Sequence, residues 1–414
     1  MAATDNTNQP RYLLAKIFFW LGSFAVTSII SLTPAVFVYA SEDNFDVAGS
    51  MSIAARVYTQ NPSYSEQNAS DLISVYLQPE LRYEGTTGRY TFVPFYRFDS
   101  IDDERTHFDI RELNWRNFSD QWDILIGIDR VFWGVTESRH LVDIINQTDL
   151  VDNIDEESKL GQPMIRFNLI SELGNTTLFL LPGFRERTFP GSKGRLRAPH
   201  TVSTGDVEYE SDKKSSHLDW ALRYSLVIND WDIGVSYFSG TSREPRLITN
   251  DSESVLIPFY DQINQLGIDA QLTSESWLWK FEGINRYEQD RSFFAGVLGL
   301  EYTLYQIADS DKDLGLLGEL LYDNRDENAP PTLFDRDIFF GLRLNMNDVD
   351  ASEILVGLIY DNEKRQHIFK LEAKTRLSQR LSVALEAWQF HDSQSNRLDY
   401  SQDDYIQLQL NWHL

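Results

Sequence analysis

The feature that most constrains this chain is an alternation of apolar and polar residues that recurs in segments of about ten residues. In the last segment, every second residue from Ile406 to Leu414 is apolar, and the residues between them are Gln, Asn or His. The same pattern runs through 220–228 and 369–376. Such alternation predicts β-strands with one apolar and one polar face, as in a soluble sandwich or a membrane barrel. The length favours the barrel, because a tilted strand needs about ten residues to cross a bilayer.

The number and spacing of these segments also favour a membrane barrel. About eighteen strands can be placed, and they begin near residues 47, 70, 90, 106, 122, 163, 176, 219, 231, 263, 276, 293, 313, 337, 352, 367, 382 and 404. The connections after even-numbered strands are mostly short turns, whereas the long loops follow odd-numbered strands, at roughly 133–162, 183–217, 241–262, 324–336 and 392–403. This segregation is typical of membrane barrels and places both termini at the turn end. Tryptophans near the turns predict an aromatic girdle: Trp115, Trp122, Trp231, Trp277 and Trp412.

The N-terminal segment is predicted to be a cleaved signal peptide. Arg11 and Lys16 precede an apolar run over 17–38, and Val38-Tyr39-Ala40 offers a small-residue cleavage site. The expected division is therefore a signal peptide over 1–40 and a barrel over 41–414. A membrane anchor is the alternative, because about 20 apolar residues can span a bilayer.

Composition removes several other functions. The formal charge of −26 argues against nucleic-acid binding, and the absence of cysteine excludes disulfides and thiolate metal sites. The acidic run 309–313 imitates a calcium loop, but Leu314 stands where that loop needs glycine. Ser138, His140 and Asp143 are too close in sequence to suggest a catalytic triad. No cofactor, metal site or enzymatic activity is predicted.

The last ten residues carry a family resemblance. Tyr405–Leu414 resembles the C-terminal recognition strand of outer-membrane proteins, although that strand usually ends in Phe and here Trp412 and Leu414 stand near the end. In size and layout, residues 41–414 resemble the large porin-like families, which include porins of 16 or 18 strands and alginate-export-type channels. The resemblance implies an all-β, antiparallel, up-and-down transmembrane barrel in a Gram-negative outer membrane, with both termini periplasmic. It also implies contacts with membrane lipid, lipopolysaccharide and the barrel-assembly machinery, and it is compatible with a homo-oligomer.

The polar faces of the strands predict a charged lumen. The predicted lumen charges are Arg82, Arg97, Arg111, Arg166, Arg223, Lys280, Arg343, Lys370, Lys374, Arg376, Glu282, Glu319 and Glu372. Further inward candidates are Arg116, Arg286, Glu80, Asp109, Asp129, Glu172, Asp269 and Glu301. Facing charges of opposite sign would favour polar or charged solutes over apolar ones. The alternative is a network of salt bridges that stiffens the wall and leaves no open pore.

The long loop after the fifth strand is the best candidate for a constriction. Leu141, Ile144 and Ile145 have the spacing of a short helix that packs one face on the wall. The predicted pore-constricting residues are Arg130, Glu137, Arg139, His140, Asp143 and Asp149. The alternative is an external loop that packs on other loops or on a second subunit. The next long loop holds a basic cluster that could attract anionic solutes or lipopolysaccharide phosphates: Arg185, Arg187, Lys193, Arg195 and Arg197.

Two functional hypotheses follow from these patterns. The first is a channel for passive or selective diffusion of small polar or charged solutes. The second is a barrel without an open path that has a structural, adhesive or assembly role through its external loops. They differ in whether the lumen conducts, and no motif identifies a solute.

Overall fold

The computed structural model of this chain describes residues 44–249, 255–361, 363–391 and 398–414. The predicted signal peptide, residues 1–40, lies outside the described residues and stays a prediction. Within the described ranges, no helix is both long and apolar enough to span a membrane.

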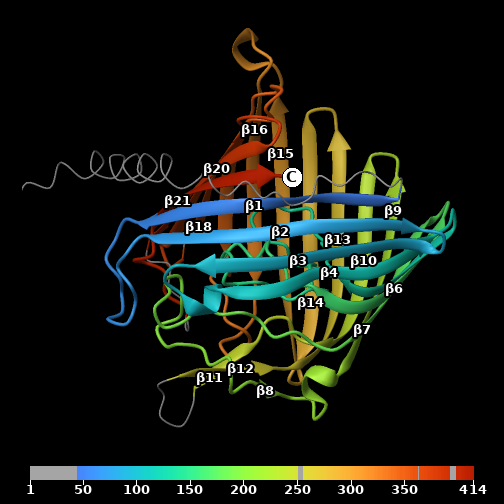
Figure 1. Cartoon of the computed structure of the whole chain (residues 1–414), viewed down its shortest axis with the longest axis horizontal. Coiled ribbons are helices and arrows are strands. Elements are labelled where there is room, and N and C mark those ends of the chain that lie inside the picture. Colours follow the sequence, from blue (N-terminus) through green and yellow to red (C-terminus); the bar gives the residue numbers. More distant parts are fainter. Residues whose placement is uncertain (1–43, 250–254, 362, 392–397) are drawn as a thin grey trace, which may run out of the picture. The chain divides into compact units, whose positions relative to one another are not determined.

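Eighteen strands form one antiparallel sheet, and β21 pairs with β1, so the sheet closes into a barrel (Figure 1). The strands of the barrel are β1 (Phe45–Tyr58), β2 (Leu72–Gly85), β3 (Gly88–Asp99), β4 (His107–Phe118), β5 (Trp122–Asp129), β6 (Gln162–Ser171), β7 (Gly174–Pro182), β9 (Leu218–Ile228), β10 (Trp231–Thr241), β13 (Gln262–Ser274), β14 (Trp277–Glu288), β15 (Arg291–Leu304), β16 (Asp313–Asp323), β17 (Asp337–Asn345), β18 (Glu353–Asp361), β19 (His367–Arg376), β20 (Leu381–His391) and β21 (Tyr405–His413).

A second, small sheet is built from the long loops. It contains β8 (Glu208–Tyr209), β11 (Arg246–Thr249) and β12 (Leu256–Tyr260), which lie together at the lower edge of Figure 1. The described connections also contain three short 3-10 helices, at Asp103–Arg105, Lys214–Ser216 and Ile307–Asp309. The small sheet was not anticipated from the sequence, because its strands are too short to show an alternation.

The predicted barrel is confirmed in its strand number and in its layout. Each predicted strand start lies within two residues of the observed one. Every barrel strand pairs with the next barrel strand along the chain, which is the up-and-down order. The longest connections, 130–161 and 183–217, leave the same end of the barrel, whereas the turns at 86–87 and 229–230 lie at the other end.

The barrel has apolar side chains outside and charged side chains inside. On neighbouring strands, Leu298 and Leu320 are cross-strand partners and are 51% and 56% exposed on the outer face. The inward-facing Glu282 and Glu319 are 0% and 3% exposed. Water would penalise this arrangement, whereas a lipid environment favours it. Four of the five girdle tryptophans are also exposed beside the turns or the C-terminal end, namely Trp122, Trp231, Trp277 and Trp412.

One glycine in β5 is required by close backbone approach. Gly127 has φ +138°, and a Cβ there would lie 2.2 Å from the Leu113 carbonyl oxygen of β4. We expect Gly127→Val to destabilise the barrel by about 3 kcal/mol or more. A valine disfavours this positive φ, and its Cβ would clash with the Leu113 carbonyl oxygen. The midpoint of urea unfolding in lipid vesicles measures this loss. Gly318→Val is the control, because a Cβ at Gly318 meets nothing within 4 Å.

Candidate functional site

The loop that joins β5 to β6, residues 130–161, lies inside the barrel against the inward face of the wall. Its apolar residues Leu141, Val142, Ile144 and Ile145 belong to one buried cluster with side chains of β7, β9, β10, β13, β14 and β17. Val142 and Ile145 are fully buried. Apolar packing therefore fixes residues 141–145 against the wall of the barrel.

A wall carboxylate on β14 binds the first part of this loop. Glu282 accepts hydrogen bonds from the backbone amides of Val135 (2.7 Å), Thr136 (3.0 Å) and Val142 (3.2 Å). The Thr136 hydroxyl donates a fourth, at 2.7 Å. These four hydrogen bonds stabilise the negative charge of the fully buried Glu282. They also give partners to loop amides that form no hydrogen bonds within a helix or a sheet.

A second wall carboxylate, on β16, binds the neighbouring turn. Glu319 accepts hydrogen bonds from the backbone amides of Glu137 (2.7 Å) and Ser138 (2.9 Å) and from the Ser138 hydroxyl. Glu282 and Glu319 therefore act together as anchors for residues 135–142. Both were predicted as lumen charges, but their binding to the loop backbone was not visible in the sequence.

The expected short helix at Leu141, Ile144 and Ile145 is wrong. Residues 130–161 contain turns, bends and one bridge between Thr148 and Lys159, without a helix. The Val142 amide donates to Glu282 instead of to a carbonyl one helical turn earlier. The apolar spacing is explained by contact with the wall, which needs buried side chains but no helical backbone.

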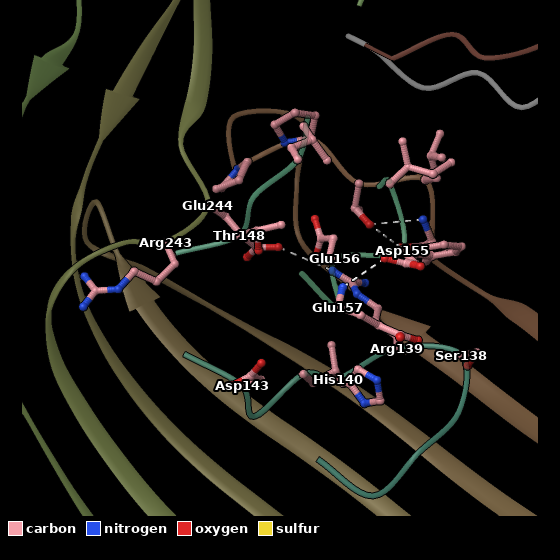
Figure 2. Close-up of a pocket in the computed structure, with 18 of the residues that line it drawn as sticks. Ser138, Arg139, His140, Asp143, Thr148, Asp155, Glu156, Glu157, Arg243 and Glu244 are labelled. Carbon is pink, nitrogen blue, oxygen red and sulfur yellow. Dashed lines mark hydrogen bonds and ion pairs between the residues drawn. The ribbon is translucent and has the colours of Figure 1, made fainter. Parts of the chain in front are cut away.

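Four of the predicted constriction residues line a cavity of about 180 Å³ in the barrel interior: Glu137, Arg139, His140 and Asp143. Figure 2 shows this cavity from close by, with Ser138, Arg139 and His140 on one stretch of the loop. The other two, Arg130 and Asp149, do not line this cavity. Arg130 pairs with Glu112 at 3.2 Å.

Each of these side chains is held by a partner. Glu137 pairs with Arg343, and Arg139 lies 3.3 Å from Asp323. Asp143 pairs with Lys159 at 3.2 Å, while burial raises the pKa of the Asp143 carboxyl.

His140 and Asp149 are held in the same way. Burial opposes protonation of His140, but the nearby Glu282 outweighs it and raises the pKa of the imidazole. Asp149 is buried, which opposes its charge, but His107 and Arg111 donate to it and lower its pKa.

The cavity has one charged side and one apolar side. Glu244 lies at the centre of the charged side, 3.6 Å from Arg139 and 3.5 Å from Arg325, and it also pairs with Arg286. Although burial opposes ionisation, these arginines hold the pKa of Glu244 well below its usual range. The apolar side comes mainly from β17–β20 and the loop before β17, and includes Phe334, Phe339, Leu355, Ile359, Ile368 and Trp388. In Figure 2 the Arg243 guanidinium points away from the other labelled side chains, in keeping with its contact to Asp219.

A second cavity, of about 300 Å³, lies between residues 152–158 of the loop and strands β1, β2, β3, β20 and β21. Hydroxyl and amide side chains dominate its wall, which includes Ser50, Ser52, Ser74, Gln78, Gln407, Gln409 and Asn411. Asp155 and Glu157 line both cavities. The two hollows therefore adjoin at these two carboxylates.

Asp155 lies where burial and neighbouring carboxylates both oppose its negative charge. Burial raises its pKa to about 7, Glu157 and Glu386 add to the rise, and Lys370 opposes it. Asn153 bridges two carboxylates, since its amide lies 2.8 Å from Asp155 Oδ2 and 2.9 Å from Glu386 Oε1. Figure 2 shows Asp155, Glu156 and Glu157 lying together. These residues were missed as site residues, although the acidic run in 152–157 was a signal for them.

Most of the predicted lumen charges form ion pairs across the wall or with the loop. Their partners are Glu80 for Arg82, Asp152 for Arg97, Asp109 and Asp149 for Arg111, Asp129 for Arg166, Asp269 for Arg223, Glu301 for Lys280, Glu137 for Arg343, Glu372 for Lys370 and Glu353 for Lys374. Arg376 is exposed at the end of β19. Arg111, Arg97 and Glu301 are buried, so these pairs replace water as partners for the inward charges.

The basic cluster of the loop 183–217 is divided among several partners. Arg185 pairs with Asp109, Arg187 with Glu156, and Arg195 with Asp403 at 2.6 Å. Lys193 is exposed and lies 3.4 Å from Asp103. The cluster therefore connects loops to one another and to the wall.

The fold is a closed antiparallel barrel of eighteen strands with an internal loop, and solved porin structures have a similar fold. A BenF-like porin from Pseudomonas fluorescens Pf-5 is similar, with a TM-score of 0.53 and 9% identity over 90% of this chain and 99% of that one. OccK3 (OpdO) from Pseudomonas aeruginosa gives a TM-score of 0.50 and 8% identity, over 89% of this chain and 96% of that one. Another OpdO structure from that organism gives 0.51 and 10%, over 89% and 97%.

The predicted porin-like fold is confirmed by these similarities, which at such low identity concern the fold. No protein-family model and no curated protein matches the sequence.

Proposed function

We propose that this chain is an outer-membrane channel for the passive or selective diffusion of small polar or charged solutes. The observation that carries the proposal is the pair of cavities that adjoin at Asp155 and Glu157 inside a closed barrel. The apolar outer face supports a membrane location, and the charged interior supports polar cargo. The BenF-like and OpdO structures are consistent with this function through their fold.

The proposal includes an orientation and a set of partners. Both ends of the barrel chain lie at the end with the short turns, which supports periplasmic termini. Lipid and lipopolysaccharide are the proposed surroundings, and the assembly machinery is the proposed partner of β21. A homo-oligomer is compatible with the barrel. A hydrolase is not proposed, because Ser138 donates to Glu319 while His140 contacts Glu282.

Recording of the refolded protein in planar lipid bilayers tests the channel. We expect reproducible ohmic current steps when the detergent-solubilised barrel is added. A silent bilayer that contains correctly folded barrel, shown by its circular dichroism and its shift on unheated gels, would favour the non-conducting alternative.

Charge reversal at the predicted constriction tests the role of its residues. Arg139→Glu removes a positive charge from the wall of the first cavity and should increase the permeability ratio of K⁺ to Cl⁻. Asp143→Lys should shift the ratio in the opposite direction. The reversal potential under a KCl gradient gives this ratio. Lys213→Glu is the control, because Lys213 is exposed in the loop 183–217 and should leave the ratio unchanged.

A further inference from the structure

The place where the two cavities adjoin holds more carboxylates than cations. We define the acidic junction as Asp155, Glu157 and Glu386. Asp155 and Glu157 line both cavities, and Glu386 lines the second. The Asn153 amide bridges Asp155 and Glu386, at 2.8 and 2.9 Å. A solute that moves between the two cavities therefore passes beside negative side chains contributed by both the loop and the wall.

Few positive charges are available to neutralise the acidic junction. Lys370 Nζ lies 3.8 Å from Glu157, but it is closer to Glu372, at 2.7 Å. Arg56 packs on the ring of Tyr405 and donates to Gln407 at 3.0 Å. Lys370 faces Asp155, Glu157 and Glu372, and Arg56 faces Glu386, so four carboxylates stand against two cations and the local charge is negative.

The other arginines of the second cavity are bound to carboxylates of their own. Arg97 pairs with Asp152, and Arg105 lies 3.0 Å from Asp99. The hydrogen-bond donors to Glu386 are neutral groups: the Trp388 ring nitrogen (2.5 Å) and the Tyr405 hydroxyl (2.6 Å). These donors fix its orientation without cancelling its charge.

The remaining wall of the second cavity offers neutral oxygen atoms. Serine hydroxyls on β1 and β2 and side-chain amides on β2 and β21 replace the charged pairs found elsewhere in the interior. Carbonyl and hydroxyl oxygens can substitute for part of the water shell of a cation, while carboxylates attract it. The first cavity differs, because its acids and arginines are interleaved around Glu244.

From this arrangement we infer that the acidic junction makes the channel select small cations, including organic cations with an ammonium group, over anions. The inference rests on the proposed channel function and names the class of solute that passes. Asp155 and Glu157 act from the loop and Glu386 from the wall. The net negative charge of the acidic junction repels anions and attracts cations where the two cavities adjoin.

Reversal potentials in planar bilayers test this inference. At about pH 8, above the raised pKa of Asp155, the wild-type channel should prefer K⁺ under a KCl gradient and the organic cation under a tetramethylammonium chloride gradient. The double variant Asp155→Asn with Glu157→Gln should lower both cation-to-anion ratios severalfold. Asp103→Asn with Glu104→Gln is the matched control, because it removes the same two charges at exposed positions and should leave the ratios unchanged. Glu386→Gln is a second, independent variant on the wall, and it should lower the ratios in the same direction.

The outcomes separate the inference from the function on which it rests. Folded wild-type protein that gives no current contradicts the proposed channel. A conducting wild type that prefers Cl⁻ overturns the inference and leaves the channel in place. The same holds if folded variants at both the loop and the wall keep the wild-type ratios.

Discussion

Replacing Glu282 and Glu319 with alanine should raise the single-channel conductance and make it noisy. These two wall carboxylates accept four and three hydrogen bonds from residues 135–142. Without them, the amides of this turn lose their partners inside the barrel, and the turn is held only by its apolar contacts and by the ion pairs of Glu137 and Arg139. A loop that leaves the wall no longer fills the interior, so the conducting area grows.

The expected size of this effect follows from the hydrogen bonds. A bond to a charged group contributes about 1.5 to 3 kcal/mol, so a net loss equal to two such bonds costs the packed loop about 3 kcal/mol. A change of this size raises the population of released loop about a hundredfold. Current traces should therefore show larger steps with frequent transitions between levels.

A wall carboxylate that does not bind the loop backbone provides the control. Glu301 lies on β15, 3.6 Å from Lys280 and 3.8 Å from Arg343. Glu301→Ala should leave the noise of the channel close to that of the wild type. If the double alanine variant folds and its conductance equals that of the wild type, the two carboxylates do not hold the loop in a constricting position.

Lowering the pH from about 8 to about 6 should weaken the proposed cation preference, because the pKa of Asp155 is raised to about 7. Above this value the carboxyl is negative, and below it the carboxyl is neutral. The charged groups that face Asp155 are Glu157 from the loop and Lys370 and Glu386 from the wall. The K⁺ to Cl⁻ permeability ratio, measured across this pH range, should fall with a midpoint near the pKa of Asp155.

A variant separates Asp155 from other groups that titrate nearby. Protonation of His140, whose pKa is also raised, adds positive charge to the first cavity and acts in the same direction. Asp155→Asn should remove the part of the pH dependence that belongs to Asp155, while His140→Gln should leave it in place. A pH profile that is identical in the wild type and in Asp155→Asn contradicts the assignment.

The barrel was predictable from the sequence because a membrane strand leaves a strong local signal. In β21 the apolar residues must face lipid and the polar residues must face the interior, so the alternation from Ile406 to Leu414 follows directly from the environment. Turns such as 229–230 and 275–276 are so short that the strands beside them can pair in only a few registers.

The interior was less predictable, because its contacts join residues that are far apart in the chain. Thr136 and Glu282 are separated by 146 positions, and nothing local in either segment shows that they meet. The helix expected near Leu141 failed for the same reason, since distant carboxylates satisfy the loop amides. The acidic run around Asp155 was visible, but its place between two cavities depends on the path of the whole loop.

The residues on either side of the internal loop, Asp129 and Gln162, are cross-strand partners in the ladder between β5 and β6. The Cα atoms of such partners lie about 5 Å apart, so the loop begins and ends at nearly the same point. A two-residue turn could join the strands without changing any pairing in the wall. This internal loop is therefore a single insertion between two paired strands, and it could be replaced, by evolution or by design, without a change in the strand order of the barrel.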